Sequence, residues 1–232
     1  MKRALGLCAL VLFGLGCGVA QPAGAASEAG RDLRLEVALI VADARVLSDP
    51  ATPPRRREGI ADRIRSSLGS LAITARYALQ VAGSQDARQD AGREAQLVAA
   101  IGELRALFAP GTLPAFLRAA DKLAAAYPVR LSYFQPLTVT PGRVSSGRAI
   151  YRRYCIGCHA SPDPNAPNPA PDLFRMAQTE PRDELLERLL AGVHGDRTTS
   201  LENPFSDEEI AGLAAYFLSG GKDGAPAAAG GR

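Results

Sequence analysis

The chain has 232 residues, of which 47% are hydrophobic and 22% are charged. This balance is typical of a globular protein and excludes an intrinsically disordered one. The formal net charge is only +3, and nearly all basic residues are arginine, which indicates a compositional bias and not a nucleic-acid-binding surface. We therefore expect no nucleic-acid partner.

Residues 1–25 have the pattern of a secretory signal peptide. Lys2 and Arg3 precede an apolar, glycine-rich stretch, and Ala23-Gly24-Ala25 offers a cleavage site. The apolar stretch is too short and too rich in glycine for a membrane span. Export predicts a periplasmic protein. Membrane association is expected only if the leader stays uncleaved or if Cys17, which follows a glycine, is lipidated.

Residues 28–134 are predicted to form a helical-bundle domain. Apolar residues recur at helical spacing in four stretches, each ended by a breaker such as Asp49-Pro50 or Pro110-Gly111. The second stretch opens with Thr52 before Pro53-Pro54, which predicts an N-cap followed by proline in the first turn. Four such helices joined by short loops indicate an antiparallel four-helix bundle. The apolar positions are Leu33, Val37, Ile40, Ala44 and Leu47, then Ile60, Ile64, Leu68, Leu71, Ala75 and Leu79, then Leu97, Ile101, Leu104 and Phe108, and finally Leu113, Phe116, Ala120, Leu123 and Tyr127.

The predicted bundle has little capacity for metal chemistry. Its sequence contains no histidine, cysteine or methionine, and its carboxylates form no Glu-x-x-His pair, so a di-iron site is excluded. Three consecutive arginines, Arg55 to Arg57, open the second helix, where their charge opposes the helix dipole. They form either a solvated loop end or a docking patch for an acidic partner. Docking, dimerisation and sensing all remain open as roles for this domain.

The segment Tyr154-Cys155-Ile156-Gly157-Cys158-His159 is a C-x-x-C-H sequence, the attachment pattern of a c-type haem. In this pattern the two thiols bond to the porphyrin and the next histidine binds the iron as proximal ligand. A thioredoxin-like redox pair is an alternative, but no strand–helix–strand pattern surrounds the motif. A zinc site could add His194, although adjacent Cys158 and His159 suit tetrahedral geometry poorly. A plain disulfide would leave His159 unexplained.

After an extended segment, with a linker expected over residues 135–142, the chain resembles the class I cytochrome c family from about residue 143 to residue 220. Gly147 to Tyr151 has the G-x-x-x-aromatic pattern of the family's first helix, and Leu213 to Tyr216 has the L-x-x-aromatic pattern of its last helix. In the family these helices cross, which suits a glycine at position 147. Ser206 to Glu209 is a capping box that opens the last helix.

Further elements fit the same family pattern. Residues 181–191 are expected to form the middle helix, ended by Gly192, and residues 221–232 a disordered tail. Ala170-Pro171-Asp172-Leu173 is similar to the family's Gly-Pro-x-Leu, with alanine in place of glycine. The sequence thus predicts an all-α protein, in which a four-helix-bundle-like domain precedes a class I cytochrome c domain.

The resemblance implies one covalent haem c, held by Cys155 and Cys158, with His159 as the proximal iron ligand. It also implies that the Pro171 carbonyl accepts the Nδ1–H of that histidine and so orients it. The expected function is electron transfer with redox partner proteins of unknown identity, and not catalysis.

The sixth iron ligand is where the resemblance fails. The family usually has a methionine in the stretch corresponding to residues 195–205, and none is present here. Met176 is a candidate ligand but also matches a residue of the pocket wall. His194 is a second candidate, and an open distal face is the third option. Ligation by either residue suits electron transfer, whereas a five-coordinate haem suits gas or peroxide binding or sensing.

Overall fold

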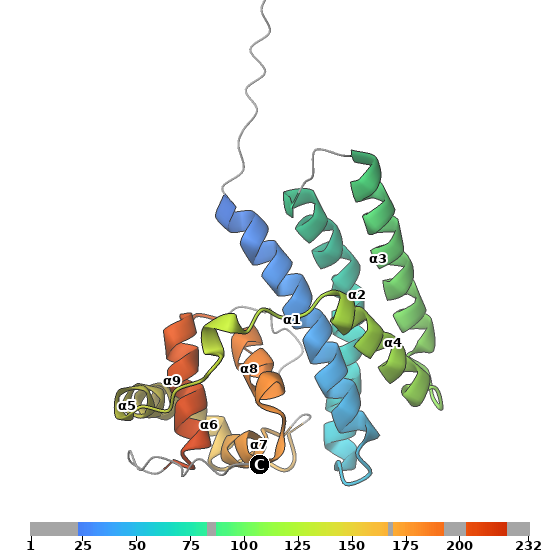
Figure 1. The fold of residues 1–232 in the computed structure, drawn as a ribbon. Helices are drawn as coiled ribbons and strands as arrows, with labels where there is room; N and C mark the ends of the chain where they lie inside the picture. Colours follow the sequence, from blue (N-terminus) through green and yellow to red (C-terminus); the bar gives the residue numbers. More distant parts are fainter. Residues whose placement is uncertain (1–22, 83–86, 167–168, 193–202, 222–232) are drawn as a thin grey trace, which may run out of the picture.

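The computed structural model describes residues 23–82, 87–166, 169–192 and 203–221 (Figure 1). Every regular element in these residues is helical, which confirms the predicted all-α class. None of the helices in the described part of the chain combines the length and the apolar content that a membrane crossing requires. The leader up to residue 22, His194 and the tail beyond residue 221 lie outside the described residues.

The predicted four-helix bundle is confirmed. It consists of α1 (Ala23–Ser48), α2 (Pro54–Ala82), α3 (Ala87–Leu107) and α4 (Leu113–Ala126). Each helix packs against the next, and α4 returns to pack on α1 (Figure 1). The four predicted apolar stripes meet in one core, in which residues such as Ile60, Ile101 and Phe116 are essentially inaccessible to solvent.

The predicted N-cap at Thr52 is wrong. Helix α2 begins at Pro54, and the Thr52 hydroxyl donates to the Val46 carbonyl at 2.7 Å. A cap at Thr52 would have to accept from the second or third helical N–H, and Pro54 in the second position has none. Arg57 closes this turn instead, because its guanidinium donates to the carbonyls of Leu47, Asp49 and Thr52 over 2.6–3.0 Å.

The second half of the chain begins with a 3₁₀ turn, η1 (Ser132–Phe134), and continues with α5 (Pro141–Ile150), one π-helical turn η2 (Tyr151–Cys155) and α6 (Ile156–His159). Helices α7 (Leu173–Thr179), α8 (Arg182–Ala191) and α9 (Asp207–Leu218) follow. Helix α5 starts inside the segment expected to be a linker, because the Thr140 hydroxyl caps it by accepting from the Arg143 N–H at 3.2 Å.

Helices α5 and α9 cross at two glycines. A side chain at Gly147 would overlap the carbonyl of Gly212 and would lie 2.8 Å from the Leu213 nitrogen. Only hydrogen atoms fit between the two backbones there, so the glycine that the sequence singled out permits the crossing. The Ser206–Glu209 capping box is present at the start of α9. Gly192, with a φ of 62°, ends α8 as expected.

Helix α1 belongs to two cores. Its predicted stripe, from Leu33 to Leu47, faces the bundle, whereas Leu35 and Leu39 lie in the core formed by α5 to α9. Helix α8 packs directly against α1, and Figure 1 shows α1 between α2 and α8. The two halves of the molecule therefore share a helix and do not hang on a free linker.

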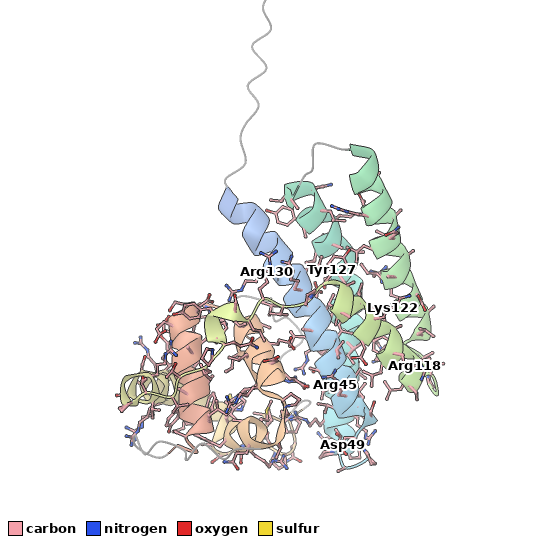
Figure 2. All side chains as sticks on the ribbon, viewed as in Figure 1. Arg45, Asp49, Arg118, Lys122, Tyr127 and Arg130 are labelled. Atoms are coloured by element: carbon pink, nitrogen blue, oxygen red, sulfur yellow. The ribbon has the colours of Figure 1, made fainter. Side chains whose placement is uncertain are left out.

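Charged residues fill part of the contact between α1 and α8. Asp43 of α1 is 2% exposed and accepts two hydrogen bonds of 2.6 Å from Arg63 of α2. Arg188 of α8 donates to Asp43 at 3.2 Å and to Glu184 at 3.1 Å. Arg45, which is labelled on α1 in Figure 2, lies at the rim of this cluster and bridges Glu184 to Asp121 of α4. We call Asp43, Arg63, Glu184 and Arg188 the ionic layer.

Candidate functional site

The C-x-x-C-H segment lies where α5 gives way to α6. A single π-helical turn, of a kind often found at functional sites, leads into it. Residues three apart on a helix share a face, so this backbone directs both thiols to one side. Cys155 is half-buried, Cys158 is exposed, and neither is in a disulfide. Burial, and then the neighbouring Cys158, raise the pKa of the Cys155 thiol.

The histidine of the motif has one defined partner. Nδ1 of His159 lies 2.7 Å from the carbonyl oxygen of Pro171, twelve residues along the chain. A carbonyl can only accept a hydrogen bond, so the ring proton must sit on Nδ1. This tautomer leaves the lone pair of Nε2 free to bind a metal ion.

Aromatic side chains pack beside the motif. Tyr151, Phe174, Tyr216 and Phe217 form a cluster with ring centroids 5.3–6.0 Å apart, mostly edge to face. These rings come from η2, α7 and α9, so they join the motif to the crossing of α5 and α9. They give the site a rigid apolar base.

Apolar surface also lies next to the thiols. Tyr154 is 59% exposed and Ile156 is 42% exposed, although both are large apolar side chains. Tyr154 packs edge-on against Phe205 at 5.3 Å, at the start of the segment that leads into α9. Two neighbouring thiols, a histidine with a free Nε2 and exposed apolar surface fit a flat, apolar ring that carries an iron ion.

The two candidates for the sixth ligand differ in what the structure describes. Met176 lies on α7 and is buried, with 7% of its surface exposed. His194 and residues 195–202, most of the stretch in which the family places its methionine, lie outside the described residues. Asn203, in the described end of that stretch, donates to the carbonyls of Leu189 and Leu190 at the end of α8. These hydrogen bonds attach the segment that leads into α9 to the end of α8.

The alternative readings of the motif can be compared with this geometry. A thioredoxin-like pair would follow a strand, whereas here helix α5 precedes the thiols. A zinc site would need His194, and within the described ranges no three His, Cys, Asp or Glu side chains form a group that could hold a metal ion.

The arginines at the start of α2 contact the loop between α6 and α7, a link that sequence reasoning missed. Arg55 donates to the Asn165 carbonyl at 2.7 Å, and Arg56 donates to the Pro169 carbonyl at 3.0 Å. Both arginines therefore contact the chain's own loop, a contact that neither expectation included. The adjacency of three arginines was the only signal in the sequence, and nothing in it pointed to a loop 110 residues away.

The comparisons with known proteins concern this half of the chain. Residues 142–217 match the family model described as "Cytochrome C oxidase, cbb3-type, subunit III", which spans α5 to nearly the end of α9. No curated protein and no solved structure matches the chain. The segment from α5 to α9 is therefore a class I cytochrome c domain, a type of domain that binds haem c covalently and transfers electrons, and the helical bundle that precedes it lies outside the match.

Proposed function

We propose that this protein is an exported monohaem c-type cytochrome that carries electrons between redox partner proteins. Cys155 and Cys158 would hold the porphyrin through two thioether bonds, and Nε2 of His159 would bind the iron. When bound, the haem supplies a one-electron iron couple whose potential depends on the axial ligands and their hydrogen bonds. The chain's own residues attach, orient and partly shield that group.

The observation that carries this proposal is the hydrogen bond from His159 to Pro171. It places the ring proton on Nδ1 at 2.7 Å from the carbonyl, which orients the imidazole and leaves Nε2 available. A histidine serving only as a surface residue would have no need of this bond. Because the bond raises the basicity of the ring, it also strengthens the imidazole as an iron ligand.

Carrying electrons, as opposed to catalysis, fits the surroundings of the thiols. Cys158 is exposed and Cys155 only half-buried, so an edge of the attached ring would lie at the surface, where outer-sphere exchange takes place. The matching family is named for a subunit of an oxidase, which supports exchange with other redox proteins. The signal-peptide pattern supports a periplasmic location, with membrane association only if Cys17 is lipidated or the leader is retained.

For the sixth position we propose His194 ahead of Met176. Met176 is buried on α7, as a side chain of the pocket wall would be. His194 follows the end of α8 and precedes the stretch in which the family's methionine is missing.

The decisive experiment is to produce the full chain in a host with working haem-ligation machinery. The mature protein should exceed its polypeptide mass by one haem and show a Soret band, and Cys155→Ala with Cys158→Ala should abolish both. A bare polypeptide mass without Soret absorbance would refute the proposal.

A low-spin ferric signal that is lost in His194→Ala but kept in Met176→Leu would support His194 as the sixth iron ligand. A high-spin ferric haem that takes up added imidazole would instead favour the gas- or peroxide-binding function.

A further inference from the structure

The loop that carries Pro171 is held by the N-terminal bundle. The Nη1 atom of Arg56, on the first turn of α2, lies 3.0 Å from the carbonyl oxygen of Pro169. Arg55 donates in the same way to Asn165 at 2.7 Å. The Pro171 carbonyl, two residues beyond Pro169, accepts from His159. A side chain from outside the cytochrome domain therefore holds the same short segment that orients the histidine.

The segment between the two contacts is stiff. It reads Pro169-Ala170-Pro171, so two of its three φ angles are fixed by proline rings. The residue before a proline is also confined to extended conformations, which restricts Ala170 as well. A displacement of the Pro169 carbonyl would therefore be passed on to the Pro171 carbonyl and not absorbed between them.

Arg56 is a strong donor at this point. It is half-buried, and its neighbours include two cations, Arg63 and Arg188, and two carboxylates, Asp43 and Glu180. Burial, and then Arg188 and Arg63, lower the pKa of Arg56, while the two carboxylates oppose this. An arginine stays charged in such a setting, and a charged donor makes the stronger kind of hydrogen bond to a carbonyl.

We propose that Arg56 is a positioning residue for His159 and acts through the Pro169-Ala170-Pro171 segment. This inference rests on the proposed haem ligation by His159. In this role the bundle holds the proximal ligand's hydrogen-bond acceptor in place, and so helps to set the electronic properties of the iron site.

The test uses the haem-loaded full chain and the Nδ1 proton of His159, whose exchange with deuterium is followed by NMR. Arg56→Met removes the donor at similar length, and Arg56→Lys keeps the charge. Arg57→Met is the matched control, because Arg57 is the next residue but donates to carbonyls at the end of α1 and in the turn after it, and not to the Pro171 loop. Reduction potentials of Arg56→Lys and the wild type, which have equal charge, provide a second readout.

Deuterium exchange of the His159 Nδ1 proton should be faster in Arg56→Met than in the wild type by a factor on the order of ten. A hydrogen bond from a charged donor contributes a factor of this size to an equilibrium constant. Exchange should be intermediate in Arg56→Lys and unchanged in Arg57→Met. The potential of Arg56→Lys should rise, because a less firmly bonded imidazole stabilises ferric iron less. Wild-type exchange in both Arg56 variants, or equal acceleration in Arg57→Met, would overturn the inference.

Failure of the proposed function would look different. If the purified wild-type chain carried no haem, ligation by His159 would be refuted, and ¹⁵N shifts of the His159 ring in that same chain would still test the positioning. The Nδ1–H tautomer should then predominate in the wild type and lose its excess in Arg56→Met. Equal tautomer ratios in the two proteins would refute the role of Arg56 separately. If Arg56→Met failed to fold, Arg56→Lys would decide by the same readouts.

Discussion

Two helix contacts hold the cytochrome domain in place, and they differ in kind. Helices α5 and α9 meet backbone to backbone at Gly147 and Gly212. Helices α1 and α8 meet through the ionic layer, with Asp43 2% exposed and Arg188 9% exposed. The first contact tolerates no added volume, whereas the second tolerates no unpaired charge. Each should therefore fail under a different kind of substitution.

The largest effect is expected at the glycine crossing. Gly147→Val would place a branched Cβ onto the Gly212 carbonyl, and neither backbone can give way cheaply, so we expect a loss of about 3 kcal/mol or more in the free energy of unfolding. Urea unfolding followed by circular dichroism measures it. Gly102→Ala on α3, where nothing lies within 4 Å of an added Cβ, is the control and should be neutral or stabilising. Similar midpoints for the two variants would contradict the crossing as described.

A somewhat smaller loss is expected in the ionic layer. Asp43→Asn keeps the shape of the side chain but leaves Arg63 and Arg188 without their shared carboxylate. This should cost about 3 kcal/mol, because the buried Arg188 and the partly buried Arg63 both lose a charged partner. Asp121→Asn removes a partner of Arg45 whose side chain is 47% exposed, and should cost less than about 1 kcal/mol. Equal urea midpoints for Asp43→Asn and Asp121→Asn would show that the buried ion pairs contribute no more to stability than the exposed one.

The contact between α1 and α8 should also depend on pH. Burial first, and then Glu184 and Asp183, raise the pKa of Glu187 from 4.5 to about 7. Below pH 4.5 both folded and unfolded chains hold this proton, and between pH 4.5 and 7 only the folded chain does, so stability falls as the pH rises through that range. Glu187→Gln should avoid the loss and gain about 2 kcal/mol over the wild type at pH 8, but nothing at pH 4.

Chemical denaturation at both pH values measures this difference, with Glu103→Gln on the exposed side of α3 as the control. A constant difference between Glu187→Gln and the wild type at pH 4 and pH 8 would exclude the titration of Glu187 as its source.

The smallest effect is expected at the surface, beside the start of α9. Glu208 accepts two hydrogen bonds of 2.8 Å from Arg143 and one from Tyr133, and these bonds lower its pKa to about 2. Their contribution should be present above pH 4.5 and disappear as the pH falls towards 2. Glu208→Gln should differ slightly from the wild type at pH 7 and not at pH 2, and added salt should shrink the difference. A difference that persists at pH 2 would point to packing instead.

The two contacts also explain what the sequence could and could not predict. Gly147 and the Ser206–Glu209 box are local signals, since a small residue before an aromatic and a cap before an apolar run each specify their own surroundings. The bundle stripes are local in the same sense. Asp43 and Arg188 are 145 positions apart, and each on its own looks like an ordinary charged residue on a helix. Their pairing is a tertiary fact that no pattern of spacing contains.

One missed signal was nevertheless present. Between residues 33 and 44, α1 is apolar on almost every face, and a helix that is hydrophobic all round is buried on all sides. The predicted stripe from Leu33 to Leu47 accounts for one face of α1 only. Leu35 and Leu39 lie on another face and therefore require a second apolar surface to pack against. At the haem motif, the contact between His159 and Pro171 was expected from the family pattern, whereas the approach of Arg56 depends on where the bundle sits.

The double use of α1 has a consequence for how such a molecule can be altered by recombination. A cytochrome module grafted elsewhere without this helix would carry an exposed apolar strip where Leu35 and Leu39 now lie. A bundle left behind would keep the pair of Asp43 with Arg63 but lose the contact of Asp43 with Arg188. The two halves should therefore be transferred together, even though the haem motif lies in only one of them.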